Sequence, residues 1–456
     1  MRWAAAVWTA WAWSSPAWAA DIDASGRVEA HARVAINGCW PTCGYVDFHD
    51  AAVVGGSVRA DFDRRVRAVL AADVRAHATS DLQTVEDSGS ITLISPVSLK
   101  LKEASIGAFG VAAPWLDFGT GVRTLHWGVA DGITLVNNLN PYDLEDPTRF
   151  DGRLAVPMVA INAHPGPVIA EAAWAPFFTP AALPTDQVDV LAGARDVFDV
   201  GGANATDVRS LDSITTVPPT SLANSSVSGR VAVQVPRADI AVSWFHGRDS
   251  LPQVDGTVLL TGFATNSDRV DVGVPVTWPR IDVGGLEARG ELPWEIGGWV
   301  EAAIVLPERT EAALSEGQLT DLVDLGALDE VPDPIPTTVT QDGNPYARWI
   351  VGLDRSTGRF YVNVQWLHGF PTERQLADLH DYGMLAVRVT LADHWVLSLR
   401  GVSDGAGYLG GAEIVYLHGD AAEISLGGVW IDGPEGSALR GFRAVSNVGL
   451  GTVVRF

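Results

Sequence analysis

The sequence is poor in cysteine and lysine, with only Cys39, Cys43, Lys100 and Lys102 among 456 residues. Two thiols cannot supply all the ligands of a structural zinc site, so we expect no metal there and favour a disulfide closed in an oxidising compartment. Acidic residues outnumber basic ones by 55 to 31, which gives a formal net charge of -24. Nucleic-acid binding therefore has no electrostatic basis.

Beyond its N-terminus the chain lacks an apolar run of the ~20 residues that a membrane-spanning helix needs. The N-terminus itself has Arg2, an apolar stretch at 3–13 and the sequence Ala-Trp-Ala at 17–19. This order is typical of a secretory signal peptide, and the apolar stretch is short for a retained anchor. We therefore expect residues 1–19 to be cleaved and residues 20–456 to form the exported protein.

The sequence also lacks the common catalytic motifs. It has no G-x-S-x-G, H-E-x-x-H or P-loop sequence, and its ten histidines are scattered. A hydrolase would need a serine, a histidine and a carboxylate that converge in space, which motif absence alone does not rule out. We predict no enzyme and no cofactor, and keep an outer-membrane hydrolase as a third alternative.

What the chain has in abundance is alternation of apolar and polar residues. At its C-terminus one face of a strand carries Val448, Leu450, Thr452, Val454 and Phe456, and the other carries Asn447, Gly449, Gly451, Val453 and Arg455. Side chains in a strand alternate between two faces, so this pattern places one face in an apolar medium. Such strands reconcile a hydrophobic content of 47% with the large net charge, because lipid contacts only one face.

The same pattern recurs along the chain. Its longest example, 57–77, exceeds one bilayer crossing and is either two strands with a turn near Asp63 and Arg64 or one protruding strand. Further alternating segments lie near 97–109, 114–126, 153–162, 167–175, 228–235, 239–246, 257–264, 269–278, 297–306, 346–354, 359–369, 383–391, 395–402, 408–417 and 421–431. Tryptophans that close strands, such as Trp174, Trp244, Trp278 and Trp430, suit an aromatic girdle at the membrane interface.

The spacing of these segments predicts an all-β fold. At roughly 25 residues per strand and loop, the mature chain supplies about 16 to 18 antiparallel strands of a transmembrane barrel, with an even count. We expect one barrel domain over 20–456 with long loops near 184–226 and 307–345, either of which could fold into the lumen.

Charged residues in the strands identify the inward face, because a charge facing lipid at the midplane costs about 2–4 kcal/mol. The predicted pore-lining residues are Arg59, Asp61, Arg65, Arg67, Asp73, Arg75, Arg123, Glu171, Asp271, Arg348, Asn363, Gln365 and Arg388. Many of these charges are expected to pair with one another and brace the wall. An unpaired row of Arg59, Arg65, Arg67 and Arg75 would instead form a positive ladder that weakens cation selectivity.

A second candidate site is the segment 127–149, which is dense in turn-forming residues. It contains Asp131, Asn137, Asn140, Asp143 and Arg149. The favoured interpretation is a succession of turns, since Asn and Asp cap turns and Pro fixes φ. A constriction of the lumen is the next alternative, ahead of a Ca²⁺ site, whose EF-hand spacing is missing.

The segments 127–149 and 361–370 resemble motifs of a broad, poorly characterised group of porin-like outer-membrane proteins of Gram-negative bacteria. The terminal Phe456 after alternating apolar residues is similar to the assembly signal of outer-membrane barrels. The resemblance implies an outer-membrane barrel and no known substrate. As partners we expect outer-membrane lipid, lipopolysaccharide, the barrel-assembly machinery and small solutes, and a homo-oligomer is compatible with this interpretation.

Three functions follow from this interpretation. The first is a porin-like channel for passive diffusion of small hydrophilic solutes. The second is a barrel filled by its own loops that serves a structural, adhesion or partner-binding role. The third is the hydrolase named above.

Overall fold

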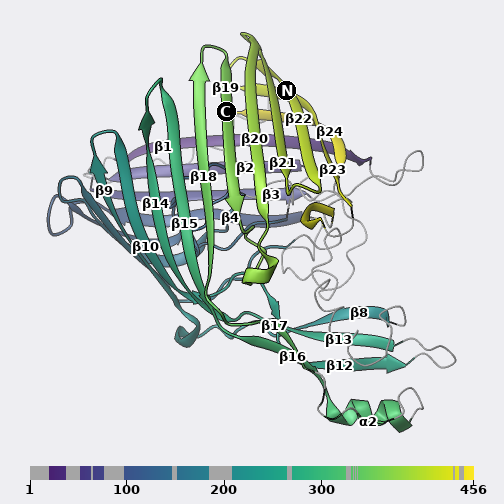
Figure 1. The fold of residues 1–456 in the computed structure, drawn as a ribbon. Coiled ribbons are helices and arrows are strands. Elements are labelled where there is room, and N and C mark those ends of the chain that lie inside the picture. Colours follow the sequence, from purple (N-terminus) through teal and green to yellow (C-terminus); the bar gives the residue numbers. More distant parts are fainter. Residues whose placement is uncertain are drawn as a thin grey trace.

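In the computed structural model, 18 strands form one sheet that closes on itself, because the last strand pairs with the first (Figure 1). The barrel strands are β1 (Ala20–Ala35), β2 (Ala52–Phe62), β3 (Val66–Ala76), β4 (Val97–Ala108), β5 (Leu116–Arg123), β6 (Val156–Ala163), β7 (Val168–Ala175), β9 (Ser226–Val235), β10 (Ala238–Arg248), β14 (Arg280–Leu292), β15 (Ile296–Pro307), β18 (Tyr346–Thr357), β19 (Phe360–His368), β20 (Asp381–Ala392), β21 (Trp395–Ser403), β22 (Tyr408–His418), β23 (Ala422–Asp432) and β24 (Asn447–Arg455). The predicted antiparallel barrel with an even strand count is confirmed.

The structure describes residues 20–36, 52–62, 65–76, 97–145, 151–183, 208–263, 270–324, 330–331, 333, 335, 337–434, 437–440 and 446–456. The predicted signal peptide, Cys39, Cys43 and Arg149 lie outside these residues. None of the described helices is long and apolar enough to cross a membrane.

A second sheet of six strands is built from the three connections β7–β9, β10–β14 and β15–β18. It contains β8 (Val208–Thr215), β11 (Gln253–Val254), β12 (Gly256–Phe263), β13 (Val270–Thr277), β16 (Thr310–Leu314) and β17 (Thr337–Gln341). The helix α2 (Glu316–Asp324) lies between β16 and β17, and the short helices η3 (Leu222–Asn224) and η4 (Leu376–Asp378) lie in connections. Figure 1 shows this sheet projecting beyond one end of the barrel.

The two segments 257–264 and 269–278 were expected in the barrel wall, and this expectation is wrong. They form β12 and β13 of the second sheet, because alternation shows that a strand has one apolar face but not which sheet it joins. Two strands that the sequence reasoning missed, β1 and β14, complete the barrel. Their outward rows rely on alanine and glycine, which makes their alternation weaker.

The two ends of the barrel differ in the length of their connections. Short turns join pairs such as β2 and β3, where residues 63–65 separate the strands, as one of the two sequence interpretations predicted. Strand β1 begins and strand β24 ends at this end of the barrel. Outer-membrane barrels have short periplasmic turns and longer extracellular loops, so this end is periplasmic and the second sheet is extracellular.

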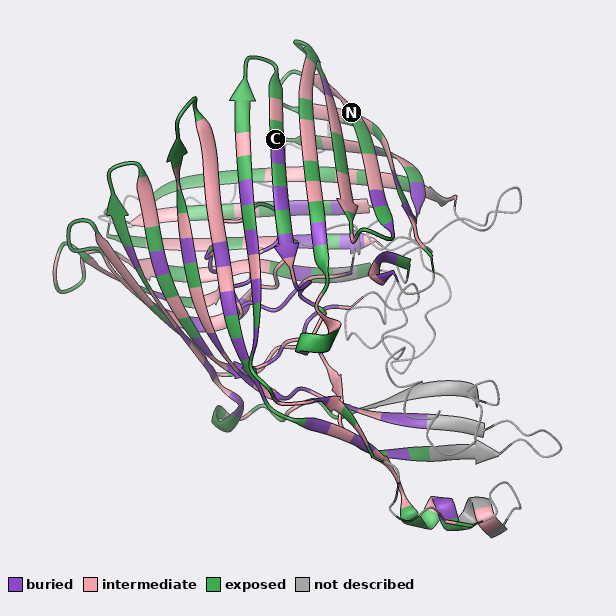
Figure 2. Cartoon of the chain, viewed as in Figure 1, coloured by how far each residue is buried: buried purple, intermediate pink, exposed green. Residues whose placement is uncertain are grey.

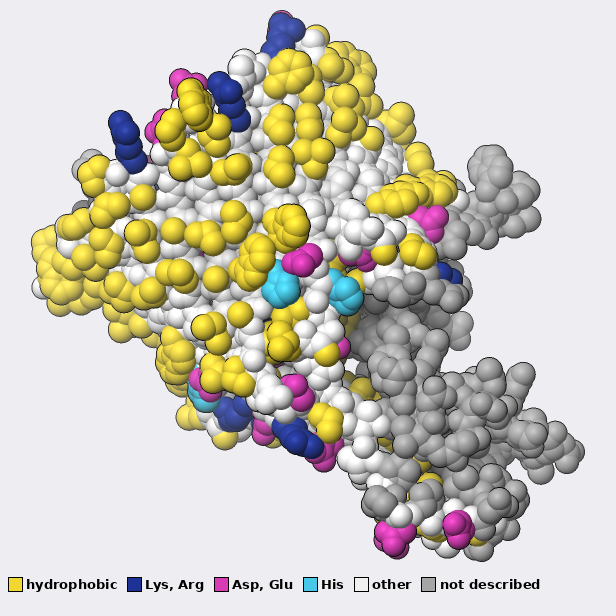
Figure 3. All heavy atoms as spheres, in the orientation of Figure 1, with side chains coloured by type: hydrophobic (Ala, Val, Ile, Leu, Met, Phe, Trp, Pro, Cys, Tyr) yellow, Lys and Arg dark blue, Asp and Glu magenta, His cyan; other side chains and the backbone are white. Residues whose placement is uncertain are grey.

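The outward face of the wall is apolar. On β19, Val364 is 52% exposed and its neighbour Gln365 is 7% exposed, as the alternation predicts. Hydrophobic side chains form a broad band over the strands, and charged side chains gather at its edges (Figure 3). Trp174, Trp244 and Trp430 are exposed as a girdle requires, whereas Trp278 is buried against Phe178 in the connection to β14. The outer surface is therefore suited to lipid.

The C-terminal residue takes part in closing the barrel. The backbone of Phe456 donates to Gly26 O at 2.9 Å, and Gly26 N donates to Phe456 O at 2.7 Å. A Cβ at Gly26 would lie 2.6 Å from the Phe456 ring, so the glycine makes room for the terminal aromatic residue. The ring itself is 76% exposed on the outward face.

The apolar core lies inside the barrel, in its extracellular half. It joins residues of the β5–β6 connection, such as Ile133 and Leu135, to inward residues near the loop ends of the strands, such as Phe245, Ile350 and Ile431. Figure 2 shows buried residues concentrated toward the loop ends of the strands that face the viewer. The described residues of β1–β4 and β24 contribute no member to this core.

Candidate functional site: the barrel lumen

The connection between β5 and β6 enters the lumen with its described residues, 124–145 and 151–155. The side chains of two asparagines hold this connection in its folded path. Asn137 donates a hydrogen bond to Leu125 O at 2.7 Å. Asn140 accepts one from Leu125 N at 2.8 Å and donates one to Leu154 O at 3.0 Å. Positive φ angles at Gly128 and Gly132 allow the turns between. Asparagine and glycine thus build the predicted succession of turns, and the segment lies inside the barrel.

The segment found in the lumen differs from the two long connections considered from the sequence. The described residues of 184–226 and 307–345 lie mainly in the extracellular sheet and its links to the barrel. The inward segment is distinguished by its apolar residues rather than by its length. Leu135 and Val136 are each at most 2% exposed, as an inward segment packed against a wall requires.

One buried carboxylate fixes the middle of the inward segment. Glu301 on β15 is fully buried and accepts hydrogen bonds from Thr134 Oγ1 at 2.7 Å, Val136 N at 3.1 Å and Val129 N at 3.0 Å. Ala130 N and Leu135 N also donate to it. A buried carboxylate is costly unless donors surround it, and the backbone of this segment supplies them.

The two flanks of the inward segment are held by different walls. On one side, Asn363 donates to Asp131 Oδ2 at 3.0 Å and Gln365 donates to Asp131 O at 2.9 Å. On the other side, Arg75 of β3 pairs with Glu145 at 2.7 Å. Lys100 of β4 contacts both Asp143 and Glu145. The segment therefore bridges the lumen between β19 and the β3–β4 wall.

Three of the four arginines in the predicted ladder on β2 and β3 have acidic partners. Arg59 and Arg67 both pair with Asp61, at 2.7 Å each. Arg75 pairs with Glu145 as described, and Arg65 lies in the turn between the two strands. The sequence could not show these partners, because pairing depends on strand register and on the inward segment.

The other predicted lining residues occupy several environments. Asp73 pairs with Arg27 at 2.9 Å, and Arg230 joins Glu171 to Glu287, at 2.9 Å to each. Arg123 and Arg348 fall on the inward face by register, with Arg348 buried and donating to Pro371 O at 3.2 Å. Asp271 lies in β13 of the extracellular sheet, so its assignment to the barrel wall is wrong.

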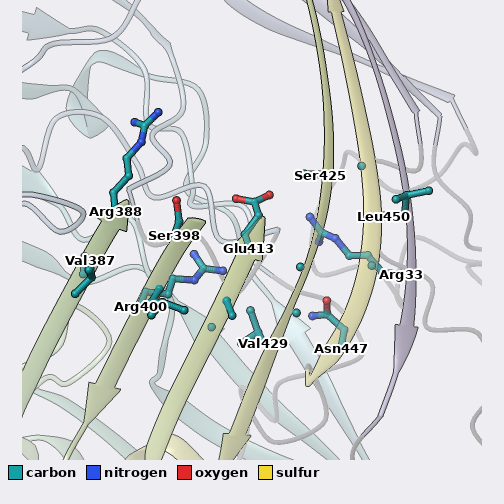
Figure 4. A pocket seen from close by; sticks show the side chains of 18 of the residues that line it. Arg33, Val387, Arg388, Ser398, Arg400, Glu413, Ser425, Val429, Asn447 and Leu450 are labelled. Carbon is teal, nitrogen blue, oxygen red and sulfur yellow. The ribbon is translucent and has the colours of Figure 1, made fainter. Parts of the chain in front are cut away.

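A recess in the lumen opens along β20–β24 and β1. It has a volume of about 470 Å³, and its lining includes Arg388, Arg400 and Glu413, which are exposed although their register places them on the inward face (Figure 4). Exposed inward charges require water in this part of the lumen. Of these residues, the prediction of lining residues contained only Arg388.

Sequence reasoning missed the part of this recess formed by β1. His31 and Arg33 face the cavity from β1, and their alternation with Ala30, Ala32 and Val34 was the available signal. Four residues of the outward row of β1 are alanine or glycine, namely Ala24, Gly26, Ala30 and Ala32, so its hydrophobic contrast is low, which explains the omission.

The structure also brings a serine, a histidine and a carboxylate to one part of the lumen. His31 Nε2 lies 3.6 Å from Glu29 Oε2. A Cβ at Gly451 would lie 2.8 Å from Ser425 Oγ and 3.0 Å from His31 Nδ1, so both side chains flank this glycine. No hydrogen bond joins Ser425 to His31 in the part of the chain that the structure describes. This arrangement does not support a nucleophile activated by a base.

Comparison with known proteins gives no match to a family model and none to a curated protein. Solved structures that match include Wzi of Escherichia coli, an outer-membrane protein involved in group 1 capsule assembly and described as a carbohydrate-binding β-barrel (9% identity, 95% of this chain and 84% of that chain, TM-score 0.46). OccAB1 of Acinetobacter baumannii also matches (8% identity, 96% of each chain, TM-score 0.46). A third match is the anion-selective porin of Comamonas acidovorans (10% identity, 96% of this chain and 100% of that chain, TM-score 0.41).

Identities of this size concern the fold alone, and the class of the protein is defined by its own barrel. An 18-strand closed antiparallel sheet, an apolar outer face and a polar inner face are the features of a bacterial outer-membrane protein. The chain forms an outer-membrane β-barrel, as its sequence predicted.

Proposed function

We propose that the protein is a passive channel for small hydrophilic solutes. The observation that carries this proposal is the water-accessible recess of about 470 Å³, into which Arg388, Arg400 and Glu413 project from the inward face. A barrel sealed by its own side chains would bury these charges. Their exposure instead supports a lumen that holds water along β20–β24 and β1.

The path of solutes follows the side of the barrel formed by β24 and β1–β4. This side contributes no described residue to the apolar core, and it is lined by ion pairs such as Arg27 with Asp73. The described part of the inward segment crosses the lumen from β19 to the β3–β4 wall and narrows the passage. Such a polar path with charges of both signs favours hydrophilic solutes over apolar ones.

Conductance of the refolded protein in planar bilayers tests the channel. We expect stepwise currents from protein whose mobility on gels shifts on heating, which marks a folded barrel, and none from heat-denatured protein. A folded barrel that inserts and passes no current would contradict the proposal.

The second candidate is a sealed barrel with a partner-binding role. Two observations favour it: the inward segment packs into an apolar core that reaches from β6 to β23, and a separate sheet projects on the extracellular side. Insertion without conductance would support this candidate. For either function we expect lipid and lipopolysaccharide against the outer face and recognition of the terminal strand by the barrel-assembly machinery.

A further inference from the structure

The recess differs from the wall formed by β2 and β3 in the pairing of its arginines. Arg388 of β20 has no ion-pair partner among the described residues, whereas Arg59 and Arg67 share Asp61. Its cross-strand neighbours in register are Tyr361 and Ser398, which carry no neutralising charge. Figure 4 shows Arg388 and Arg400 projecting from adjacent strands on the same side of the sheet.

An exposed arginine without an acidic partner presents its planar guanidinium for a bidentate contact with a carboxylate. Arg33 and Arg400 also line this cavity, but the preference for an anionic group rests on Arg388 alone. Because water is limited in a recess, charges there act on a solute more strongly than screened loop charges do. The recess therefore favours an anionic group near Arg388, despite the acidic net charge of the chain.

The same recess holds acceptors and donors suited to hydroxyl groups. Glu413 of β22 lies directly opposite Ser398, and it too has no ion-pair partner among the residues described. Ser425 and Asn447 line the cavity beside it. Glu413 repels a second negative charge on a solute and accepts hydrogen bonds from hydroxyls, so it selects a monoanion over a dianion.

Glycines in the wall make room for the side chains that line the recess. Positions 411, 427, 449 and 451 on three neighbouring strands are glycine and line the cavity. A Cβ at Gly411 would lie 2.8 Å from Arg400 Nε, and one at Gly449 would lie 2.7 Å from Arg33 Cγ. The volume of the recess, about 470 Å³, lies within the range of small-molecule sites.

We propose that this recess is a binding subsite for a small monoanion that carries hydroxyl groups, such as a sugar acid. The carboxylate contacts Arg388, and the hydroxyl groups contact Glu413, Ser398 and Ser425. The inference rests on the proposed channel function, because solute reaches this recess through the lumen.

Gluconate provides the test, measured as block of the ion current through the refolded channel in dilute KCl. Arg388→Gln should raise the half-blocking concentration about tenfold or more, as expected for loss of a charged hydrogen-bonding partner. Arg59→Gln is the matched control, since it makes the same substitution on the lumen wall at an ion-paired residue. It should change the half-blocking concentration less than about twofold.

Two further solutes separate the parts of the ligand. Glucose lacks the carboxylate and acetate lacks the hydroxyl groups, so both should block at higher concentrations than gluconate. Glu413→Gln should weaken block by gluconate and leave block by acetate unchanged. Equal block by gluconate and acetate, or no effect of Arg388→Gln in a conducting channel, would overturn the subsite.

A barrel that never conducts would contradict the proposed channel, and the subsite would then be decided by equilibrium dialysis of gluconate against the folded protein in detergent. Binding that Arg388→Gln abolishes and Arg59→Gln preserves would support the subsite on its own. Absence of binding to the wild-type barrel would overturn it.

Discussion

Glu301→Gln is expected to release the inward segment from the barrel wall. The wild-type carboxylate is fully buried and accepts five hydrogen bonds, four of them from the backbone N–H groups of Val129, Ala130, Leu135 and Val136. Glutamine is nearly the same size, but its amide nitrogen cannot accept. The substitution therefore leaves at least two backbone donors facing another donor, whichever way the amide turns.

The magnitude follows from the number of donors that lose their acceptor. A buried polar group left unsatisfied costs about 1–3 kcal/mol, so two of them cost about 2–6 kcal/mol. The cost is local to the segment, because the strand pairing of β15 does not involve the Glu301 side chain. A change of about 2 kcal/mol corresponds to roughly thirtyfold in a local opening equilibrium.

Hydrogen exchange measured by mass spectrometry checks this prediction at the amides of residues 128–136. We expect these amides to exchange at least about thirtyfold faster in Glu301→Gln, while the strand amides remain protected. Glu423→Gln is the control, since Glu423 also lies on the wall but pairs with Arg455 at a partly exposed site. Equal protection of residues 128–136 in wild type and Glu301→Gln would refute the reasoning.

Three other predictions concern the wall and its ends. Deleting Phe456, whose backbone hydrogen-bonds to β1, should reduce outer-membrane yield, and normal yield would contradict its role as an assembly signal. Leu399→Arg on the lipid face should lower the free energy of unfolding in vesicles by about 2–4 kcal/mol. Ser398→Arg, one position along and in the recess, should leave that free energy nearly unchanged. Equal losses at the two positions would disprove the assignment of these side chains to lipid and lumen. Burial raises the pKa of Asp404, but donors that include Gly407 N and Ser437 Oγ outweigh it and hold the pKa at about 2. Because this folded pKa is below its ordinary value, the hydrogen bond from Ser437 to Asp404, which joins two loops, should persist near pH 4 and weaken as the pH falls toward about 2. Pepsin should therefore cleave wild-type protein near Ser437 faster at about pH 2 than near pH 4. In Asp404→Asn cleavage should be fast at both pH values.

The sequence by itself determined the class of fold, because the membrane imposes a pattern that can be read locally. Every backbone group must be paired within lipid, so strands must close into a barrel, and one face of each strand must be apolar. The alternation of Val364 and Gln365 and of the terminal strand therefore predicts facing correctly. The spacing of the alternating segments also predicted about 16 to 18 strands, a range that includes the 18 observed.

Only the tertiary structure decided which alternating segments join the barrel and what fills its lumen. An apolar residue at every second position shows that a strand has one apolar face, but it does not show which strands lie beside it. In sequence, β13 therefore looks like a strand of the barrel. Leu135 and Glu301 form a hydrogen bond although they are 166 residues apart in the sequence, and no local pattern connects them. The pairing of Arg59 and Arg67 with Asp61, and the exposure of Arg388 opposite no acid, likewise depend on register across the closed sheet.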